Sequence, residues 1–207
     1  MNLITDYKHF IYIVFFTICF NISYCQNVQD DFEGNGTITT WYGDNCEIST
    51  NFSNPFRVNG NTSSTVLRYS DTGGQFANAR FDIPSNFDLT QNNSFSIKIY
   101  VSSNGLTGAQ PNQVSLKLQD NRLSQPYTTQ SEIIKAIQLN QWQIVTFDFE
   151  NDNFINLNPN SPPPITRTDF NRVVIQVNGE NNSDSVLAYI DDIEYFILFL
   201  TILFMII

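Results

Sequence analysis

The sequence contains few of the residues on which most enzyme active sites and nucleic-acid interfaces depend. Its 207 residues include one histidine, three cysteines and ten lysines and arginines, against twenty aspartates and glutamates. The net charge of −10 argues against nucleic acid as a partner, because phosphate binding requires clustered Lys and Arg. Aromatic residues make up 14% of the chain, which is too many for a disordered acidic segment and indicates a folded body.

The N-terminal segment MNLITDYKHFIYIVFFTICFNISYCQ follows the pattern of a secretory signal peptide. Lys8 and His9 precede an apolar run that is too short for an ordinary spanning helix, and small residues lie near Cys25. Tyr24, immediately before this cysteine, disfavours lipid attachment there. We therefore predict a signal peptide at residues 1–25 and a secreted or cell-surface protein.

Cleavage would remove His9, Cys19 and Cys25, which leaves Cys46 as the sole cysteine and no histidine. A mature chain of this composition has no internal disulfide and no Ser–His or Cys–His nucleophile pair. It also has no histidine ligand for zinc and no HExxH arrangement. These absences exclude several common hydrolase and zinc-enzyme sites.

Beyond residue 26, short segments of alternating apolar and polar residues are separated by Asn, Ser, Gly and Pro. In SFSIKIYV, for example, Phe95, Ile97, Ile99 and Val101 share one face. NQVSLKLQ, WQIVTFDF and NRVVIQVN repeat the pattern, and TVLRYSD, QFANARFDI, SEIIKAI and VLAYIDDIEY are further candidates. Period-two alternation predicts strands with one buried face. About eight to ten such strands, with no helical period, predict an all-β, antiparallel β-sandwich.

The predicted sandwich forms a single domain over residues 26–195. The loop NLNPNSPPPITRTD contains three consecutive prolines, so it must lie at the surface or at a sheet edge. A short hydrophobic tail follows at Phe196–Ile207. As a helix, this tail would reach about 18 Å, short of the ~30 Å hydrocarbon core. It fits weak membrane association or a strand extension, but our preferred hypothesis is the end of a truncated or frame-shifted gene.

Acidic residues occur at both ends of the predicted domain, in QNVQDDFEG and in AYIDDIEY. If the first and last strands are neighbours, Asp31, Glu33, Asp191 and Asp192 would converge. Calcium takes six to eight oxygen ligands, including two or three carboxylates. Strand alternation sends the two adjacent aspartates to opposite faces, so only one would point at a given site. Solvated acids at the sheet edge are the alternative interpretation.

The opening DFEG, the tryptophan strand QWQIVTFDF and the closing YIDDIEY together resemble the galactose-binding-like jelly-roll carbohydrate-binding modules. In particular, DFEGNGTITTWYGDNC, TGGQFANARFDI, QVSLKLQ and DFNRVVIQVNGENN resemble an N-terminal module of secreted Bacteroidetes polysaccharide hydrolases of the laminarinase and agarase type. The resemblance covers residues 31–195. It implies a jelly-roll fold that binds polysaccharide, and a structural Ca²⁺ held by Glu33 and Asp191.

A sugar ring has one apolar face and a rim of hydroxyls, so its site needs an exposed aromatic platform flanked by amides and charged groups. Outward strand positions and loops offer these candidates: Trp41, Tyr42, Arg80, Tyr100, Lys117, Gln119, Tyr127 and Gln176. We expect Tyr100, Lys117 and Gln119 to share one sheet face as a shallow groove. Trp41 fits equally well as a plug at the end of the sandwich. Lys117 also fits a solubilising role, and Trp142 is assigned to the core.

Catalysis is the main alternative to binding. A glycosidase needs two carboxylates about 5–10 Å apart, and Glu47, Glu132, Asp148 and Glu150 are available for such a pair. However, the Glu-x-Asp-x-x-Glu or Glu-x-Asp-x-Glu strand of laminarinase-type hydrolases is absent from the sequence. We therefore predict a non-catalytic polysaccharide-binding module, the accessory part of a truncated glycoside hydrolase. A structural or adhesive surface domain that binds protein, or a remnant without a function of its own, remains the alternative.

Overall fold

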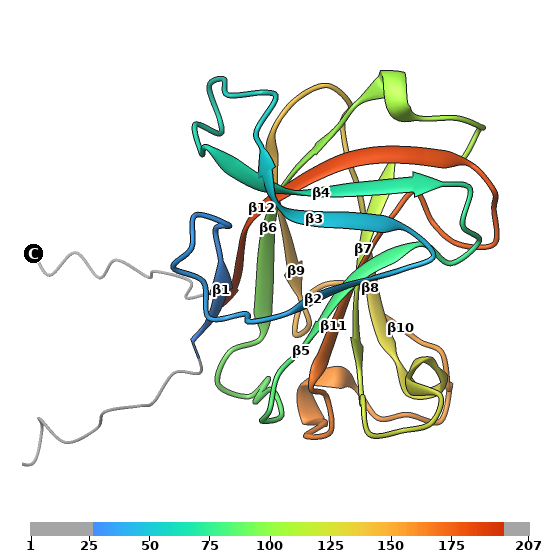
Figure 1. Cartoon of the computed structure of the whole chain (residues 1–207). Coiled ribbons are helices and arrows are strands. Elements are labelled where there is room, and N and C mark those ends of the chain that lie inside the picture. Colours follow the sequence, from blue (N-terminus) through green and yellow to red (C-terminus); the bar gives the residue numbers. More distant parts are fainter. Residues whose placement is uncertain (1–26, 197–207) are drawn as a thin grey trace, which may run out of the picture.

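The computed structural model of the protein describes residues 27–196, which form a β-sandwich of two antiparallel sheets (Figure 1). The predicted all-β sandwich is therefore confirmed. The signal peptide predicted at residues 1–25 and all but the first residue of the predicted tail lie outside the described residues. Within residues 27–196, no helix is long and apolar enough to cross a membrane.

The first sheet has the strand order β3-β4-β12-β6-β9, and β1 also pairs with β12. Its strands are β1 (Val28–Asp30), β3 (Glu47–Ser53), β4 (Thr65–Thr72), β6 (Ser94–Val101), β9 (Gln143–Asp148) and β12 (Ser185–Phe196).

The second sheet has the order β10-β8-β7-β11-β5-β2. Its strands are β2 (Trp41–Asp44), β5 (Asn78–Asp82), β7 (Gln113–Gln119), β8 (Ser131–Ala136), β10 (Ile155–Asn156) and β11 (Arg172–Val177). Three short 3₁₀ helices lie in the connections: η1 (Ser103–Gly105), η2 (Pro126–Thr129) and η3 (Pro164–Thr166).

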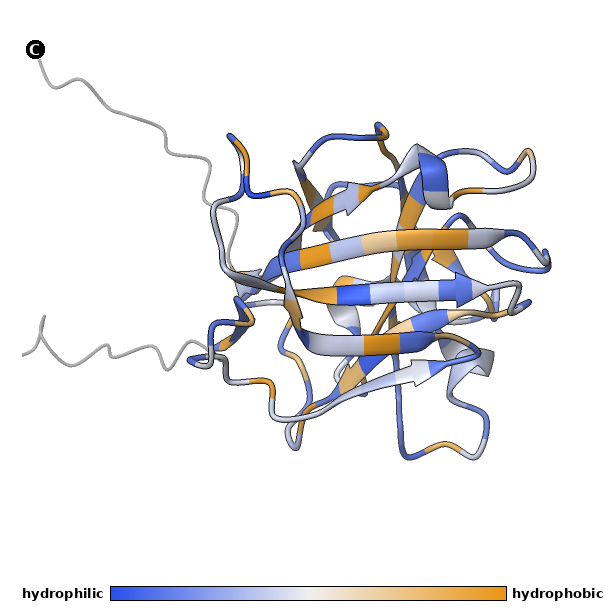
Figure 2. Ribbon diagram, turned by 45° about the horizontal axis from the view of Figure 1, so that its top comes forward, coloured by the Kyte–Doolittle hydropathy of each residue, from blue (hydrophilic) through white to orange (hydrophobic). Residues whose placement is uncertain are grey.

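The core lies between the sheets and is built from the predicted alternation. Phe95, Ile97 and Ile99 of β6 are fully buried, as are Leu116 and Leu118 of β7. Figure 2 shows the same segregation, with apolar residues concentrated along the strands and hydrophilic ones in most loops. The strand positions between these core residues point to the outer faces of the sandwich, where a binding surface can form.

The first and last described strands are neighbours, as expected. β1 pairs with β12 in a register that places Val28 opposite Tyr195. A β-bulge interrupts β12 after Asp191, where Asp192 adopts a positive φ of 43°. The bulge separates the two adjacent acids. Asp191 is fully buried, whereas Asp192 forms an ion pair with Lys98 at 2.5 Å.

Strands β2 and β3 were not among the predicted strands because their residues show no clear alternation of burial. They flank a turn at Asn45, which has a φ of 53°, and then enter different sheets, β2 at the edge of one and β3 at the edge of the other. Edge positions leave side chains half exposed on both faces, which removes the periodic signal.

Candidate functional site

A groove of about 590 Å³ lies over the outer face of the second sheet. Its floor is formed by outward-facing residues of β5, β7 and β11, chiefly Arg80, Lys117, Gln119, Arg172 and Gln176. Strand alternation explains why they gather there, since their neighbours in sequence point into the core. The floor is therefore polar, although the strands that carry it are mostly apolar.

Strand register aligns the floor side chains into rows that cross the sheet. One row runs from Glu132 on β8 through Lys117 on β7, Val174 on β11 and Arg80 on β5 to Tyr42 on β2. Directly opposed side chains on one face lie about 5 Å apart and interact. The row therefore brings a carboxylate, an ammonium, a guanidinium and a phenol into one band across the groove.

Each arginine of the floor is paired with a carboxylate. Arg80 Nε donates to Asp44 Oδ2 at 2.7 Å, and its guanidinium carbon lies 4.5 Å from the ring centroid of Tyr42. Arg172 forms a bidentate pair with Asp82, with distances of 2.6 and 2.9 Å. Burial opposes ionisation of Asp82, but the hydrogen bonds and charge of Arg172 outweigh it and lower the pKa of this carboxyl.

Lys117 lies near the centre of the floor with only 5% of its side chain exposed. Its Nζ is 3.6 Å from Glu132 Oε1 and also contacts the carboxylate of Glu180, which lies in the loop between β11 and β12. Burial lowers the pKa of Lys117, and the charge of Glu132 opposes this shift. The lysine is thus enclosed by two acids on different elements.

Amide groups complete the floor. Gln119 Nε2 donates to Gln130 Oε1 at 2.8 Å, and Gln176 Nε2 donates to the carbonyl of Ala77 at 3.3 Å. Within residues 27–196, Gln176 Oε1 and Asn78 Oδ1 are buried without a hydrogen-bond partner. A buried oxygen without a donor costs about 1–3 kcal/mol, so both positions favour a hydroxyl donor from a ligand or from water.

The walls of the groove are partly apolar. Tyr127, on η2, is 51% exposed, and Leu157, just after β10, is 52% exposed. Phe76, in the loop before β5, also lines the groove and is 45% exposed. Exposed aromatic rings beside amides are the combination that suits the apolar face and hydroxyl rim of a sugar.

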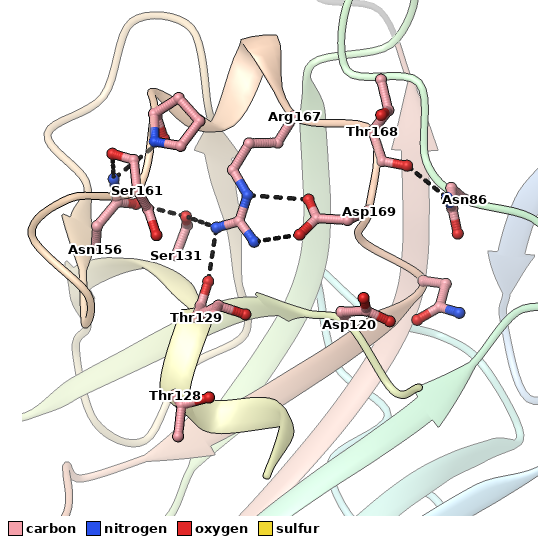
Figure 3. Close-up of polar contacts among 12 residues, drawn as sticks. Asn86, Asp120, Thr128, Thr129, Ser131, Asn156, Ser161, Arg167, Thr168 and Asp169 are labelled. Atoms are coloured by element: carbon pink, nitrogen blue, oxygen red, sulfur yellow. Dashed lines mark hydrogen bonds and ion pairs between the residues drawn. The ribbon is translucent and has the colours of Figure 1, made fainter. Parts of the chain in front are cut away.

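The buried side chain of Arg167 contacts Thr129 and Asp169 (Figure 3). Thr129 belongs to η2, the element that carries Tyr127. Arg167 Nη1 donates to the carbonyl of Thr129, the last residue of η2, at 2.6 Å. Its Nε and Nη2 donate to Asp169 at 2.9 and 2.6 Å, and its guanidinium carbon lies 3.9 Å from the ring centroid of Phe170. These contacts join the proline-rich segment to η2.

The structure brings together most of the residues that the sequence suggested for a sugar site. Five of them line the groove: Arg80, Lys117, Gln119, Tyr127 and Gln176. Tyr42 packs against Arg80 at the edge of the same floor and is 44% exposed.

Trp41 points to the interior instead. Its Nε1 donates to Asp30 Oδ2 at 2.9 Å, and its ring lies 4.9 Å from Phe81 and 5.6 Å from Phe32. Trp41 was considered either as a sugar-stacking residue or as a plug at the end of the sandwich. Its contacts are those of a plug.

The expectation that Tyr100 shares a sheet face with Lys117 and Gln119 is wrong. Tyr100 lies on β6 in the first sheet, whereas the other two lie on β7 in the second. Tyr100 is 7% exposed and stacks on Phe56 at 4.0 Å, in a cluster that also buries Trp142. Consecutive strands with the same alternation here belong to different sheets, so their outward faces point away from each other.

Several groove residues were not among the predicted sugar-binding residues. Glu180 comes from a loop, which carries no periodic pattern. Phe76 and Asn78 lie in QFANARFDI, a candidate strand of the sequence analysis, and alternation places both on the same face as Arg80. Glu132 was considered only as a catalytic acid. Alternation predicts that Glu132 points outward. Its place opposite Lys117 depends on the pairing of β7 with β8, which the sequence does not indicate.

The two carboxylates implied as calcium ligands meet the same loop between β3 and β4. Glu33 Oε1 accepts from the backbone N–H groups of Ser64 and Thr65 at 2.5 and 2.9 Å. Asp191 Oδ2 accepts from Asn61 Nδ2 at 2.6 Å and forms no ion pair with any described residue. Burial raises the pKa of Asp191, although the hydrogen bonds of Asn61 and Ser63 oppose the shift.

A metal at this point would need oxygens other than carboxylates. In the part of the chain that the structure describes, no group of three or more His, Cys, Asp or Glu side chains is arranged to hold a metal ion. Calcium accepts amide and backbone carbonyl oxygens, so two carboxylates and the loop remain a chemically suitable set.

No protein-family model matches this sequence, and no curated protein matches it. Among solved structures, the chain is similar to the family 11 carbohydrate-binding module of the cellulosomal cellulase Lic26A-Cel5E of Clostridium thermocellum. The two share 15% identity over 85% of this chain and 97% of that one, with a TM-score of 0.54.

It is also similar to the family 11 module from Clostridium thermocellum solved in complex with a β-1,3-1,4-mixed-linked tetrasaccharide. Here the identity is 16%, the coverage is 83% of this chain and 95% of that one, and the TM-score is 0.52. At identities of 15% and 16%, the two comparisons establish a shared fold. The chain therefore has the β-sandwich fold of these carbohydrate-binding modules.

Proposed function

We propose that this protein is a non-catalytic carbohydrate-binding module that holds a segment of polysaccharide in the groove of the second sheet. The observation that carries the proposal is the groove itself, whose floor of amides and charged groups lies between exposed walls that include Tyr127 and Phe76. Its volume of about 590 Å³ falls in the range of small-ligand sites. The shared fold with modules that bind oligosaccharide supports the same function.

The positions of the acids support binding without catalysis. A glycosidase needs one carboxylic acid kept protonated beside a second carboxylate. Of the acids considered for this role, only Glu132 lines the groove, where it pairs with Lys117. Glu47 and Asp148 lie on strands of the first sheet.

We further propose that Ca²⁺ joins Glu33, Asp191 and the loop between β3 and β4. A fully buried carboxylate without a cationic partner is costly, and a divalent cation would remove that cost. The ion would supply no chemistry in the groove. It would tie the first strand, this loop and the last strand together. Export, and an accessory role beside a hydrolase, are further proposals that rest on the sequence alone.

Affinity electrophoresis of the whole chain tests the main proposal. Gels would contain laminarin, agarose, xylan or mannan, and we expect retardation in at least one of them. Tyr127→Ala should weaken this retardation about tenfold, because it removes an aromatic platform. Phe154→Ala is the matched control, since Phe154 is exposed but does not line the groove.

Two results would contradict the proposal. A folded protein that migrates normally in every gel does not bind these glycans, and a domain that contacts other proteins becomes the better interpretation. Equal effects of the two substitutions would place any binding site outside the groove.

A further inference from the structure

We infer that the groove selects uncharged glycans, and that Glu132 and Glu180 are the residues that exclude sulfated and uronate-containing chains. The inference rests on the proposed function and specifies its ligand class. The observation behind it is that each cation lining the groove is already paired with a carboxylate of this chain.

The charges of the groove are balanced or slightly acidic. Arg80, Lys117 and Arg172 face three carboxylates that also line the groove, and Asp82 behind Arg172 adds a fourth. An anionic ligand would have to displace one of these carboxylates or bind beside it. Either course is unfavourable, because like charges brought together at a binding surface repel each other.

The pairing of cations with carboxylates is most complete at Lys117, which lies near the centre of the floor. Glu132 approaches it from β8 and Glu180 from the loop between β11 and β12. With its side chain only 5% exposed, the lysine has little surface left for a sulfate or carboxylate. The two glutamates are the more exposed members, with 15% and 34% of their side chains accessible. They present hydrogen-bond acceptors to a ligand, and sugar hydroxyls are donors that match them.

The amides lead to the same ligand class. The N–H groups of Gln176 and Asn78 donate to the backbone carbonyls of Ala77 and Phe76, whereas their carbonyl oxygens have no partner among the described residues. These two carbonyl oxygens can accept hydrogen bonds only from donor groups. A hydroxyl group supplies a donor, but a sulfate ester or an ionised carboxylate supplies only acceptors. The net charge of −10 also repels polyanions at longer range.

The test compares neutral and anionic glycans of similar backbone at low salt, where attraction to an exposed cation would be strongest. The whole chain would be run in gels of agarose against carrageenan and of mannan against alginate. We expect retardation by at least one neutral glycan and none by its charged counterpart. Stronger retardation by the charged member would overturn the inference and leave the proposed function standing. Normal migration in all gels would reject both.

The second arm of the test measures a gain of binding to anionic glycans. Glu132→Gln with Glu180→Gln should free Lys117 and increase retention on carrageenan or alginate at least about tenfold, an increase that added salt abolishes. Glu47→Gln is the matched control, because it removes the same charge from exposed β3 in the first sheet. An equal gain in the control, or no gain in the double variant, would contradict the assignment.

Folding of the variants is checked by circular dichroism. If the double variant does not fold, Glu180→Gln alone decides, since Lys117 then keeps Glu132 as a partner. A gain of several-fold is expected from this single variant, and its absence would overturn the role of Glu180.

Discussion

Arg167 joins the wall of the groove to the rest of the sandwich, and its removal should cost both stability and binding. Arg167→Met keeps much of the side-chain volume but removes the three short hydrogen bonds to Thr129 and Asp169 and the contact with the Phe170 ring. Because the arginine side chain is only 5% exposed, water does not replace these bonds around the new residue.

The magnitude follows from what each partner loses. Hydrogen bonds to charged groups contribute about 1.5–3 kcal/mol each, and a cation–π contact about 1 kcal/mol. Asp169 has 38% of its side chain exposed and regains water, so most of its share is recovered. The loss of the Thr129 bond and of the ring contact leaves about 2.5–4 kcal/mol. For a domain of this size, Tm should fall by about 5–15 °C.

The assay is urea unfolding followed by tryptophan fluorescence, together with a thermal scan. Arg122→Met is the matched control. Arg122 forms a similar bidentate pair with an aspartate two residues away, at 2.7 and 3.0 Å, but its side chain is 56% exposed. Exposed ion pairs contribute little, so the control should unfold like the parent protein. A change of less than about 0.5 kcal/mol in Arg167→Met, or equal changes in both variants, would refute the reasoning.

Three further predictions follow from the groove, the floor ion pair and the calcium proposal. Gln176→Leu should abolish glycan retardation while leaving the urea midpoint nearly unchanged, because it removes one long hydrogen bond and one unpaired oxygen together. Since the pKa of Asp82 is lowered from 3.8, its pair with Arg172 stabilises the fold above that pH and is lost as the pH falls further. Asp82→Asn should therefore flatten the unfolding free energy over this acidic interval, and an unchanged pH profile would count against the pair. A chelator should lower Tm by several degrees in the parent protein but not in Asp191→Asn, and calorimetry that shows no response to added Ca²⁺ would eliminate the metal.

Period-two alternation was enough to predict the sandwich and much of the polar floor of the groove. In β7 it sends Leu116 and Leu118 to the core and therefore Lys117 and Gln119 to the outer face, whatever the strand pairs with. The same logic placed Arg80 and Gln176 outside. These predictions succeeded because the side that faces the core depends only on the residues of one strand.

The partners of each strand were decided by the tertiary structure alone. β6 and β7 alternate in the same way, yet they lie in different sheets, and Tyr100 is therefore buried far from the polar floor that Lys117 shares. The enclosure of Lys117 by Glu180 likewise joins β7 to a loop more than sixty residues later in the chain. Contacts between segments that are distant in sequence depend on how whole strands pair and how loops return over them. No local pattern of residues carries that information, whereas the choice between inside and outside is made within each strand.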